Sequence, residues 1–355
     1  MSRPGHGGGV DRAAEELGFS REQIIDFSAS INPLGLPASA RQAILAAVER
    51  VTDYPEIDAH SLRRGLARHH DLPEANLLPG SGSTELIYHL PRTLRPRRTL
   101  IVDPAFSEYV PALQLAGSHV DTFPLRAEDA FQFTPQKLLA ALHPDTEMVW
   151  LANPGNPSGA AVAPELLRGL AESLGACRLV VDEAFVDFAP GYSLLEAVTE
   201  HENLFVLRSL TKFYAIPGLR VGYLAGPAED LERLAVERQP WTLSTLALAA
   251  ARACLDDAAY RQLTLAEIPR LRNQLKEGLE QLSLTVYPSV ANYLLFRVAD
   301  HWPDAAILCS RLRQDGFLLR NCATFPSLDN RYLRVAVRSA AENQCLLDAL
   351  AAMGG

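Results

Sequence analysis

Residues 208–222 read RSLTKFYAIPGLRVG, and this stretch decides how the chain is interpreted. Lys212 follows the predicted strand Phe205–Leu207, with Ser209 three residues before it and Arg220 eight residues after it. A lysine amine forms a Schiff base when desolvation and nearby positive charge keep it partly neutral. Ser209 and Arg220 are suited to bind a phosphate, the arginine as a forked donor. A solvated loop lysine would not need this spacing.

Two polar side chains come at the ends of the preceding predicted strands. Asp182 follows the strand Leu179–Val181, where a buried carboxylate needs a cationic partner such as a protonated pyridine nitrogen. Asn156 lies in NPGNPSG, which follows the strand Met148–Ala152. Its two Asn-Pro steps predict a rigid loop that holds the amide to donate to a phenolate oxygen. A helix N-cap is the plain alternative for Asp182.

Two further motifs complete the pattern. Ser83 and Thr84 lie in GSGSTE at a predicted helix start, where free N–H groups favour a phosphate. Phe106 lies in DPAFSEY after the predicted strand Thr99–Val102, where an aromatic ring can stack on a flat cofactor. Each motif alone is an ordinary turn or a core ring. All five motifs together, in this order, predict a site for pyridoxal 5'-phosphate.

The fold class follows from the alternation of short apolar strands with helices up to residue 240, which predicts an α/β fold with a mostly parallel, helix-covered sheet. After Trp241 the pattern changes to long helices over 243–282 and two further strands, typical of a smaller α+β domain. We therefore expect an N-terminal arm over 1–42 that joins the small domain, a large cofactor-binding domain over 43–240, and a small domain over 241–355.

Composition limits the classes of function. The chain has 355 residues and a formal charge of -9, which argues against a broad nucleic-acid surface. Its five cysteines show no metal-ligand spacing, and reduced thiols in the cytoplasm are the simplest interpretation. The N-terminus lacks the apolar segment of a signal peptide, and no apolar run approaches membrane-spanning length. We expect a cytoplasmic protein without a bound metal.

At these motifs the chain resembles the fold-type I, class I and II aminotransferases over nearly its whole length. The resemblance implies that Lys212 binds the cofactor covalently, that Asp182 meets its pyridine nitrogen and that Asn156 meets its 3-oxygen. It implies phosphate contacts from Ser83, Thr84, Ser209 and Arg220, stacking by Phe106, and a substrate-carboxylate site at Arg334 in YLRVAV. Tyr54 in DYP matches a tyrosine that reaches the phosphate of the neighbouring subunit, which implies a homodimer with shared active sites.

The closer resemblance is to the threonine-phosphate decarboxylases of cobalamin biosynthesis, a sister family of the histidinol-phosphate aminotransferases. It rests on GHGG at residues 5–8, DFSASINPLG at 26–35, DEAFVDF at 182–188, QPW at 239–241, and RNC with FP near 320–326. Phe185 stands where a tyrosine is common, so Asn156 would meet the 3-oxygen alone, and Asn321 stands in place of an expected aspartate.

The resemblance implies decarboxylation of L-threonine O-3-phosphate to (R)-1-aminopropan-2-ol O-phosphate. His6 and Asn32 in the arm are the candidates for binding the substrate phosphate. For His6, a terminal histidine without a function is an equally good interpretation. A histidinol-phosphate aminotransferase would use the same cofactor site and stays open as the alternative. A non-catalytic ligand-binding module is disfavoured because the lysine, aspartate and asparagine are all present.

Overall fold

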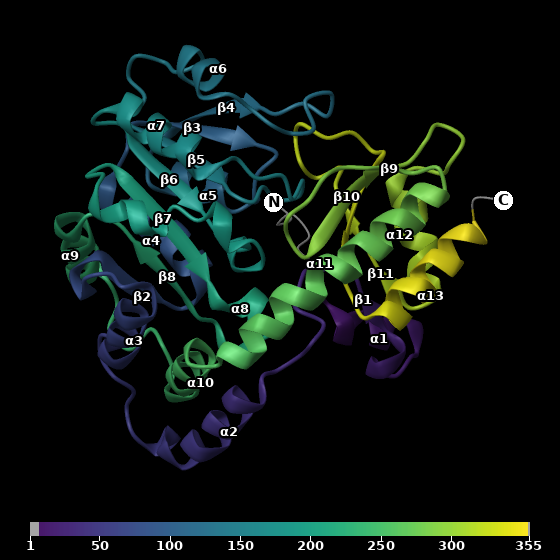
Figure 1. Ribbon diagram of the computed structural model, residues 1–355, viewed down its shortest axis with the longest axis horizontal. Coiled ribbons are helices and arrows are strands. Elements are labelled where there is room, and N and C mark those ends of the chain that lie inside the picture. The colour runs from purple at the N-terminus through teal and green to yellow at the C-terminus, as the bar shows by residue number, and fades with distance from the viewer. Residues whose placement is uncertain (1–6, 354–355) are drawn as a thin grey trace.

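A computed structural model describes residues 7–353, which form two unequal parts (Figure 1). The larger part contains a seven-stranded sheet in the order β2-β8-β7-β6-β5-β3-β4. Its strands are β2 (Leu77–Gly80), β3 (Arg98–Asp103), β4 (His119–Pro124), β5 (Met148–Ala152), β6 (Arg178–Asp182), β7 (Leu204–Ser209) and β8 (Gly222–Ala225). Strands β3 to β7 pair in parallel, and β8 runs antiparallel to both β7 and β2. The predicted mostly parallel sheet is confirmed.

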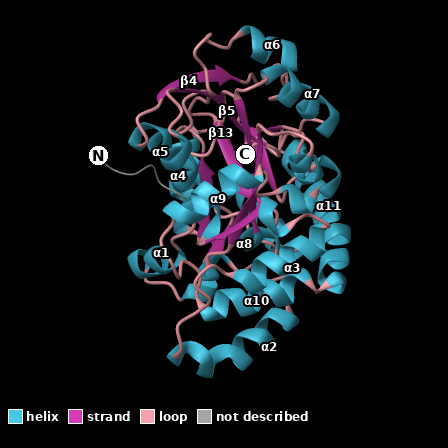
Figure 2. Cartoon of the chain, turned by 90° about the vertical axis from the view of Figure 1, so that its left-hand side faces the viewer, coloured by secondary structure: helices cyan, strands magenta, loops and turns pink. Residues whose placement is uncertain are grey.

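Helices cover both faces of this sheet, because alternate residues of each buried strand point to opposite sides. On one face Val149, Val181 and Val206 pack in a core with α3 (His60–His70), α7 (Pro164–Leu174) and α10 (Thr245–Leu255). On the other face Trp150, Val180 and Phe205 pack with α4 (Gly82–Leu94), α5 (Tyr109–Leu115) and α9 (Ala228–Glu237). The layers are visible edge-on in Figure 2. Helix α6 (Pro135–Ala140) lies near β4, and α2 (Ala38–Ala47) packs on α10.

The smaller part is built around a four-stranded antiparallel sheet in the order β12-β13-β10-β9. Its strands are β9 (Thr285–Val286), β10 (Tyr293–Arg297), β12 (Arg320–Asn321) and β13 (Tyr332–Ala336). Its helices are α11 (Ala258–Gln281), α12 (Ala305–Gln314) and α13 (Ala340–Ala351), and α11 runs from the large part into the small one (Figure 1). Strand β1 (Ile25–Asp26) pairs in parallel with β11 (Phe317–Leu318), so the N-terminal segment lies on this part.

The N-terminal arm expected over residues 1–42 contains a helix in its described part. Val10–Leu17 forms helix α1, in which Ala13 and Ala14 are buried. These alanines pack with Ile24 and Leu318, so burial of one apolar face outweighs the turn-rich composition around them. Sequence analysis also missed β2 and β4, since β2 contains Pro79 and β4 is half exposed. The predicted domain boundaries remain a prediction.

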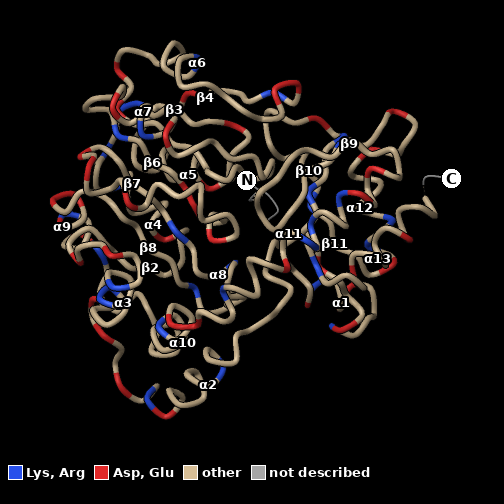
Figure 3. The backbone as a smooth tube through the Cα atoms, viewed as in Figure 1, with Lys and Arg blue, Asp and Glu red and all other residues tan. Residues whose placement is uncertain are grey.

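Charged residues of both signs are interspersed over both parts of the molecule (Figure 3). Within residues 7–353, no helix is long and apolar enough to cross a membrane. Over the same range, no cluster of three or more histidine, cysteine, aspartate or glutamate side chains could hold a metal ion.

Candidate functional site

A cavity of about 440 Å³ lies where the carboxyl ends of the parallel strands face the smaller part. The parallel strands β5, β6 and β7 bring their carboxyl ends to one edge of the sheet, the usual ligand edge of such sheets. The cavity is therefore lined by most of the residues predicted from sequence: Ser83, Thr84, Phe106, Asn156, Asp182, Lys212, Arg220 and Arg334. Eight residues from six separate segments thus converge on one space.

Lys212 lies in the short helix α8 (Leu210–Phe213), which follows β7 directly. Its Nζ donates to Thr211 Oγ1 at 3.0 Å and lies 5.8 Å from the ring centre of Phe185. Burial lowers the pKa of Lys212 to about 8, and the positive charges of Arg220 and Arg334 add to this, while Asp182 opposes it. The amine is therefore far more often neutral at physiological pH than an ordinary lysine, as attack on a carbonyl carbon requires.

Asp182 ends β6 with its carboxylate in the cavity wall. Tyr109 donates its hydroxyl to Asp182 Oδ2 at 2.6 Å, and the backbone N–H of Ala184 donates to Oδ1 at 2.9 Å. Burial raises the pKa of Asp182, whereas these two donors and the charge of Lys212 act to lower it. A cationic group arriving in the cavity would stabilise the carboxylate further.

Ser83 and Thr84 lie in the first turn of α4, where the leading N–H groups have no acceptor within the helix. A Cβ atom on Gly82 would lie 2.5 Å from Arg220 Nη2, so the guanidinium is held against this helix end. Gly82 has a φ of 76°, a left-handed conformation that glycine adopts without strain. The helix dipole and the arginine together form a cup suited to a phosphate group.

Asn156 and Arg334 are held together across the two parts of the molecule. Arg334 Nη1 donates to Asn156 Oδ1 at 2.6 Å, and Nη2 donates to the backbone oxygen of Ser28 at 2.7 Å. Because the amide oxygen is occupied, the Nδ2 group of Asn156 remains the donor it can offer to a ligand. Tyr293 packs under this pair, with the guanidinium 5.1 Å from its ring centre.

Three of the predicted residues that the structure describes, Ser209, Asn32 and Tyr54, do not line this cavity. Ser209 is buried and its hydroxyl pairs with Thr211 Oγ1 at 2.7 Å. Asn32 is buried, and its amide nitrogen donates to Phe213 O at 2.8 Å and to Thr264 Oγ1 at 3.0 Å, which commits that amide to holding the arm in place. His6 lies outside the described residues.

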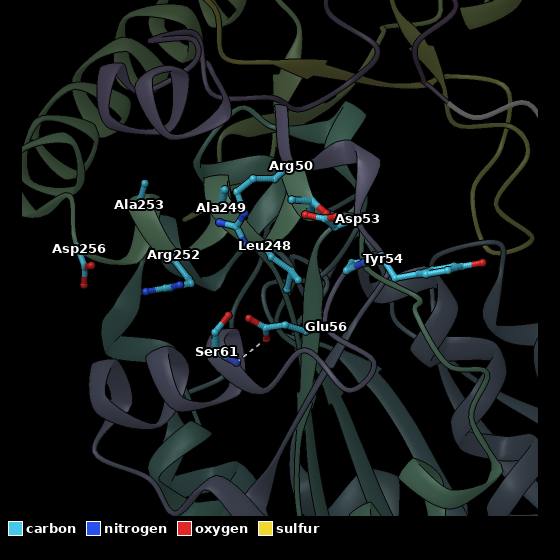
Figure 4. A pocket seen from close by; sticks show the side chains of 12 residues that line it. Arg50, Asp53, Tyr54, Glu56, Ser61, Leu248, Ala249, Arg252, Ala253 and Asp256 are labelled. Carbon is cyan, nitrogen blue, oxygen red and sulfur yellow. Dashed lines mark hydrogen bonds between the residues drawn. The ribbon is translucent and has the colours of Figure 1, made fainter. Parts of the chain in front are cut away.

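Tyr54 is 84% exposed and packs on Trp241, with ring centres 5.1 Å apart. It borders a separate surface hollow between the α2–α3 connection and α10, and its ring points away from the other labelled side chains (Figure 4). Ser61 donates its backbone N–H to Glu56 Oε2 at 2.7 Å in the wall of this hollow. A single subunit therefore leaves the phenol ring of Tyr54 uncovered.

The roles of Tyr109 and Ser28 in the site were not predicted from the sequence. Tyr109 belongs to the DPAFSEY motif, but its apolar neighbours made it look like a core residue. The spacing of three residues from Phe106 was the available signal, since the turn between β3 and α5 holds both rings at the same strand end. Ser28 contributes only its backbone oxygen to Arg334, and no pattern of side chains in the sequence predicts such a contact.

The model of the aminotransferase class I and II family matches residues 22–350. The chain belongs to this family, whose cofactor is pyridoxal 5'-phosphate. It is 41% identical to the threonine-phosphate decarboxylase of Salmonella typhimurium, over 97% of this chain and 95% of that one. It is 32% identical to histidinol-phosphate aminotransferase 2 of Pseudomonas aeruginosa, over 96% of this chain and 92% of the relative.

The fold is also similar to solved structures. The crystal structure of L-threonine-O-3-phosphate decarboxylase from Porphyromonas gingivalis matches with a TM-score of 0.83 and 26% identity, covering 92% of this chain and 98% of that one. The fold class inferred from the alternating strands and helices is therefore confirmed, as is the resemblance to this enzyme family.

Proposed function

We propose that this chain decarboxylates L-threonine O-3-phosphate with pyridoxal 5'-phosphate bound at Lys212. The relative with 41% identity over 97% of the chain is a threonine-phosphate decarboxylase, and this observation carries the choice of reaction. The carbon–carbon bond to the carboxylate breaks, carbon dioxide leaves, and one proton is taken up at Cα. The product is 1-aminopropan-2-ol O-phosphate.

The residues in the cavity fit the cofactor. Lys212 would hold its aldehyde carbon, Asp182 its ring nitrogen, Asn156 its 3-oxygen, and Phe106 its ring face. Its phosphate would lie in the cup formed by Ser83, Thr84 and Arg220, with Ser209 as a further hydroxyl behind it. When bound, the cofactor accepts the electron pair that the departing carboxylate leaves at Cα.

The chain's own groups supply orientation and proton transfer. The Asp182 carboxylate, which accepts two hydrogen bonds, would keep the ring nitrogen of the bound cofactor protonated. The Nζ atom of Lys212 is the group in the cavity wall with a pKa near 8, so it is suited to return a proton to Cα. Thr211 Oγ1 accepts a hydrogen bond from this Nζ at 3.0 Å, which orients the amine for proton transfer when it is not bonded to the cofactor.

We assign the two anionic groups of the proposed substrate to two arginines, of which Arg334 lines the cavity. Arg334 and Arg320 lie directly opposite each other on β13 and β12, so both side chains emerge on the same face of the sheet. Burial, followed by the charge of Arg334, lowers the pKa of Arg320. An α-carboxylate at Arg334 and a phosphate at Arg320 would offset this repulsion. His6 stays a proposed contact for the substrate phosphate.

The alternative activity is amino-group transfer from histidinol phosphate or a related amino acid, supported by the relative with 32% identity. The cofactor contacts are common to both reactions. Incubation of the holoenzyme with L-threonine O-3-phosphate, with carbon dioxide and keto acid measured together, separates them. Carbon dioxide without keto acid is expected, and the same assay with Lys212→Ala should release neither. Keto acid formed with an added acceptor, and no carbon dioxide, would overturn the assignment.

We also propose that the protein works in the cytoplasm as a homodimer that shares its active sites. Six apolar side chains are exposed near α2 and the hollow beside Tyr54: Leu45, Val48, Val51, Tyr54, Ile57 and Trp241. Exposed apolar patches of this kind mark protein interfaces. Sedimentation should give twice the monomer mass of 38.8 kDa, and Leu45→Glu with Val51→Glu should reduce it to the monomer. A wild-type monomer would exclude the homodimer.

A further inference from the structure

The hydroxyl of Tyr109 is assigned no contact with the cofactor or the substrate, and its hydrogen-bond partner is Asp182 Oδ2. We propose that Tyr109 is a positioning residue, which fixes the carboxylate of Asp182 in the orientation that the cofactor's ring nitrogen needs. The inference rests on the proposed function, because it assumes that Asp182 meets that nitrogen. It adds a residue that touches neither the reacting bond nor the substrate.

The geometry leaves the Asp182 carboxylate little freedom. Tyr109 donates to Oδ2 at 2.6 Å while the N–H of Ala184 donates to Oδ1 at 2.9 Å, so each oxygen has its own donor. These donors come from different elements, α5 and the segment after β6. Rotation of the carboxylate about its Cβ–Cγ bond would break both hydrogen bonds at once. The carboxylate is thus oriented before any ligand enters.

Tyr109 is itself held rigidly. Its side chain is 1% exposed, and its ring packs on Trp150 with centres 5.2 Å apart. On the cavity side it meets the ring of Phe106 nearly edge-on, with centres 5.9 Å apart. The hydroxyl therefore cannot turn away from Asp182 without disturbing two aromatic contacts. One helical turn of α5 and the loop before it thus carry both the stacking ring and the positioning hydroxyl.

The charge of Asp182 depends on this donor. Burial acts against the carboxylate and raises the pKa of Asp182, and the Tyr109 hydroxyl is the first influence that opposes this. Burial and the nearby carboxylate raise the pKa of Tyr109 well above its usual value, so the hydroxyl keeps its proton. The other ionisable groups facing the pair are Lys212 and Tyr293. Neither of them replaces a hydroxyl donor at Oδ2.

Tyr223 provides a matched control. It is also 1% exposed, and its hydroxyl forms a part-buried hydrogen bond with His70 Nε2 at 2.7 Å. It does not line the cavity and does not contact Asp182. Removal of either hydroxyl should therefore lower the melting temperature of the apoprotein to a similar degree. If Tyr109 is a positioning residue, only the substitution at Tyr109 should alter cofactor binding.

The experiment compares Tyr109→Phe with Tyr223→Phe by titrating each apoprotein with pyridoxal 5'-phosphate and recording the visible band of the lysine-bound cofactor. Tyr109→Phe should weaken cofactor binding about tenfold to a hundredfold, the usual effect of losing a hydrogen bond to a charged group, and should shift the band. Tyr223→Phe should stay within about threefold of the wild type. Equal affinities for Tyr109→Phe and the wild type would overturn the proposal.

A second measurement tests the proposal even if the Tyr109→Phe variant is destabilised. In the Asp182→Asn background, Tyr109→Phe should change cofactor affinity by less than about threefold, because the charged acceptor is gone. If Tyr109→Phe weakened cofactor binding as much in that background as in the wild type, the tyrosine would act independently of Asp182. The proposed function fails in a different way: the wild type would then bind no cofactor at Lys212, or would release no carbon dioxide from threonine phosphate.

Discussion

The two sides of the cavity are built in different ways. On the cofactor side, Asp182, Lys212 and Ser83 each belong to a short motif beside a strand of the large sheet. On the substrate side, the hydrogen bonds of Arg334 join three segments far apart in the chain, through Ser28 and Asn156. The first arrangement depends on local sequence and strand order, whereas the second exists only once both parts of the molecule have packed together.

This difference between the two sides predicts how substitutions on each side affect the enzyme. The hydrogen-bond partners of Asp182 and Lys212 lie within the large part, so these two cofactor contacts do not depend on hydrogen bonds from the substrate side. The Arg334 guanidinium donates to an amide oxygen and a backbone oxygen, the same type of acceptor that a substrate carboxylate offers. Changes on the cofactor side should therefore remove chemistry, and changes on the substrate side should weaken substrate binding while the cofactor stays bound.

The largest effect is expected for Lys212→Ala. The chain has only three lysines, and Lys137 and Lys276 lie outside the cavity. Loss of the amine should reduce turnover by about a thousandfold or more, as removal of a covalent catalytic group commonly does. Borohydride treatment of the wild-type holoenzyme followed by peptide mass analysis should find the cofactor on Lys212. Lys276→Ala is the control, and label on any other lysine would contradict the assignment.

The next effect separates the two sides directly. Arg334→Lys keeps the charge but loses the forked donor, so KM for threonine phosphate should rise about tenfold to a hundredfold. Cofactor affinity should change little, because Arg334 contacts no group assigned to the cofactor except through Asn156. Arg272→Lys, at a part-buried arginine that donates to Ala291 O at 2.9 Å, is the control. If Arg334→Lys lost the cofactor while its KM stayed unchanged, the separation between a cofactor side and a substrate side would be refuted.

The same contrast explains how much could be predicted from the sequence. The mostly parallel, helix-covered architecture and eight residues of the cavity were predicted, although strands β2 and β4 were not, because strand ends of one parallel sheet meet at one edge. The substrate-phosphate contacts were harder: Asn32 proved to be committed to Phe213 and Thr264. An amide's partners depend on distant segments, and no local pattern of residues encodes them.

A smaller effect concerns the pH dependence of cofactor attachment. Burial lowers the pKa of Lys212 to about 8, so its neutral fraction should rise about tenfold between about pH 7 and about pH 9 and then level off. Stopped-flow mixing of apoprotein with cofactor should show this profile in the attachment rate. An ordinary lysine would keep accelerating to about pH 10. Since the folded pKa is the lower one, this group also adds stability as pH rises above about 8.

The smallest effect is expected at Tyr54, the one proposed cofactor contact that a single subunit cannot complete. Tyr54→Phe should weaken cofactor binding only about threefold to tenfold, since one hydroxyl bond to phosphate is lost while Arg220 and the α4 N-terminus remain. Mixed dimers sharpen the test. When Tyr54→Phe subunits are reassembled with Lys212→Ala subunits, the sites that keep Lys212 receive an intact Tyr54 only from the partner. Their cofactor affinity should return to the wild-type value, whereas an unchanged deficit would mean that Tyr54 acts within its own subunit.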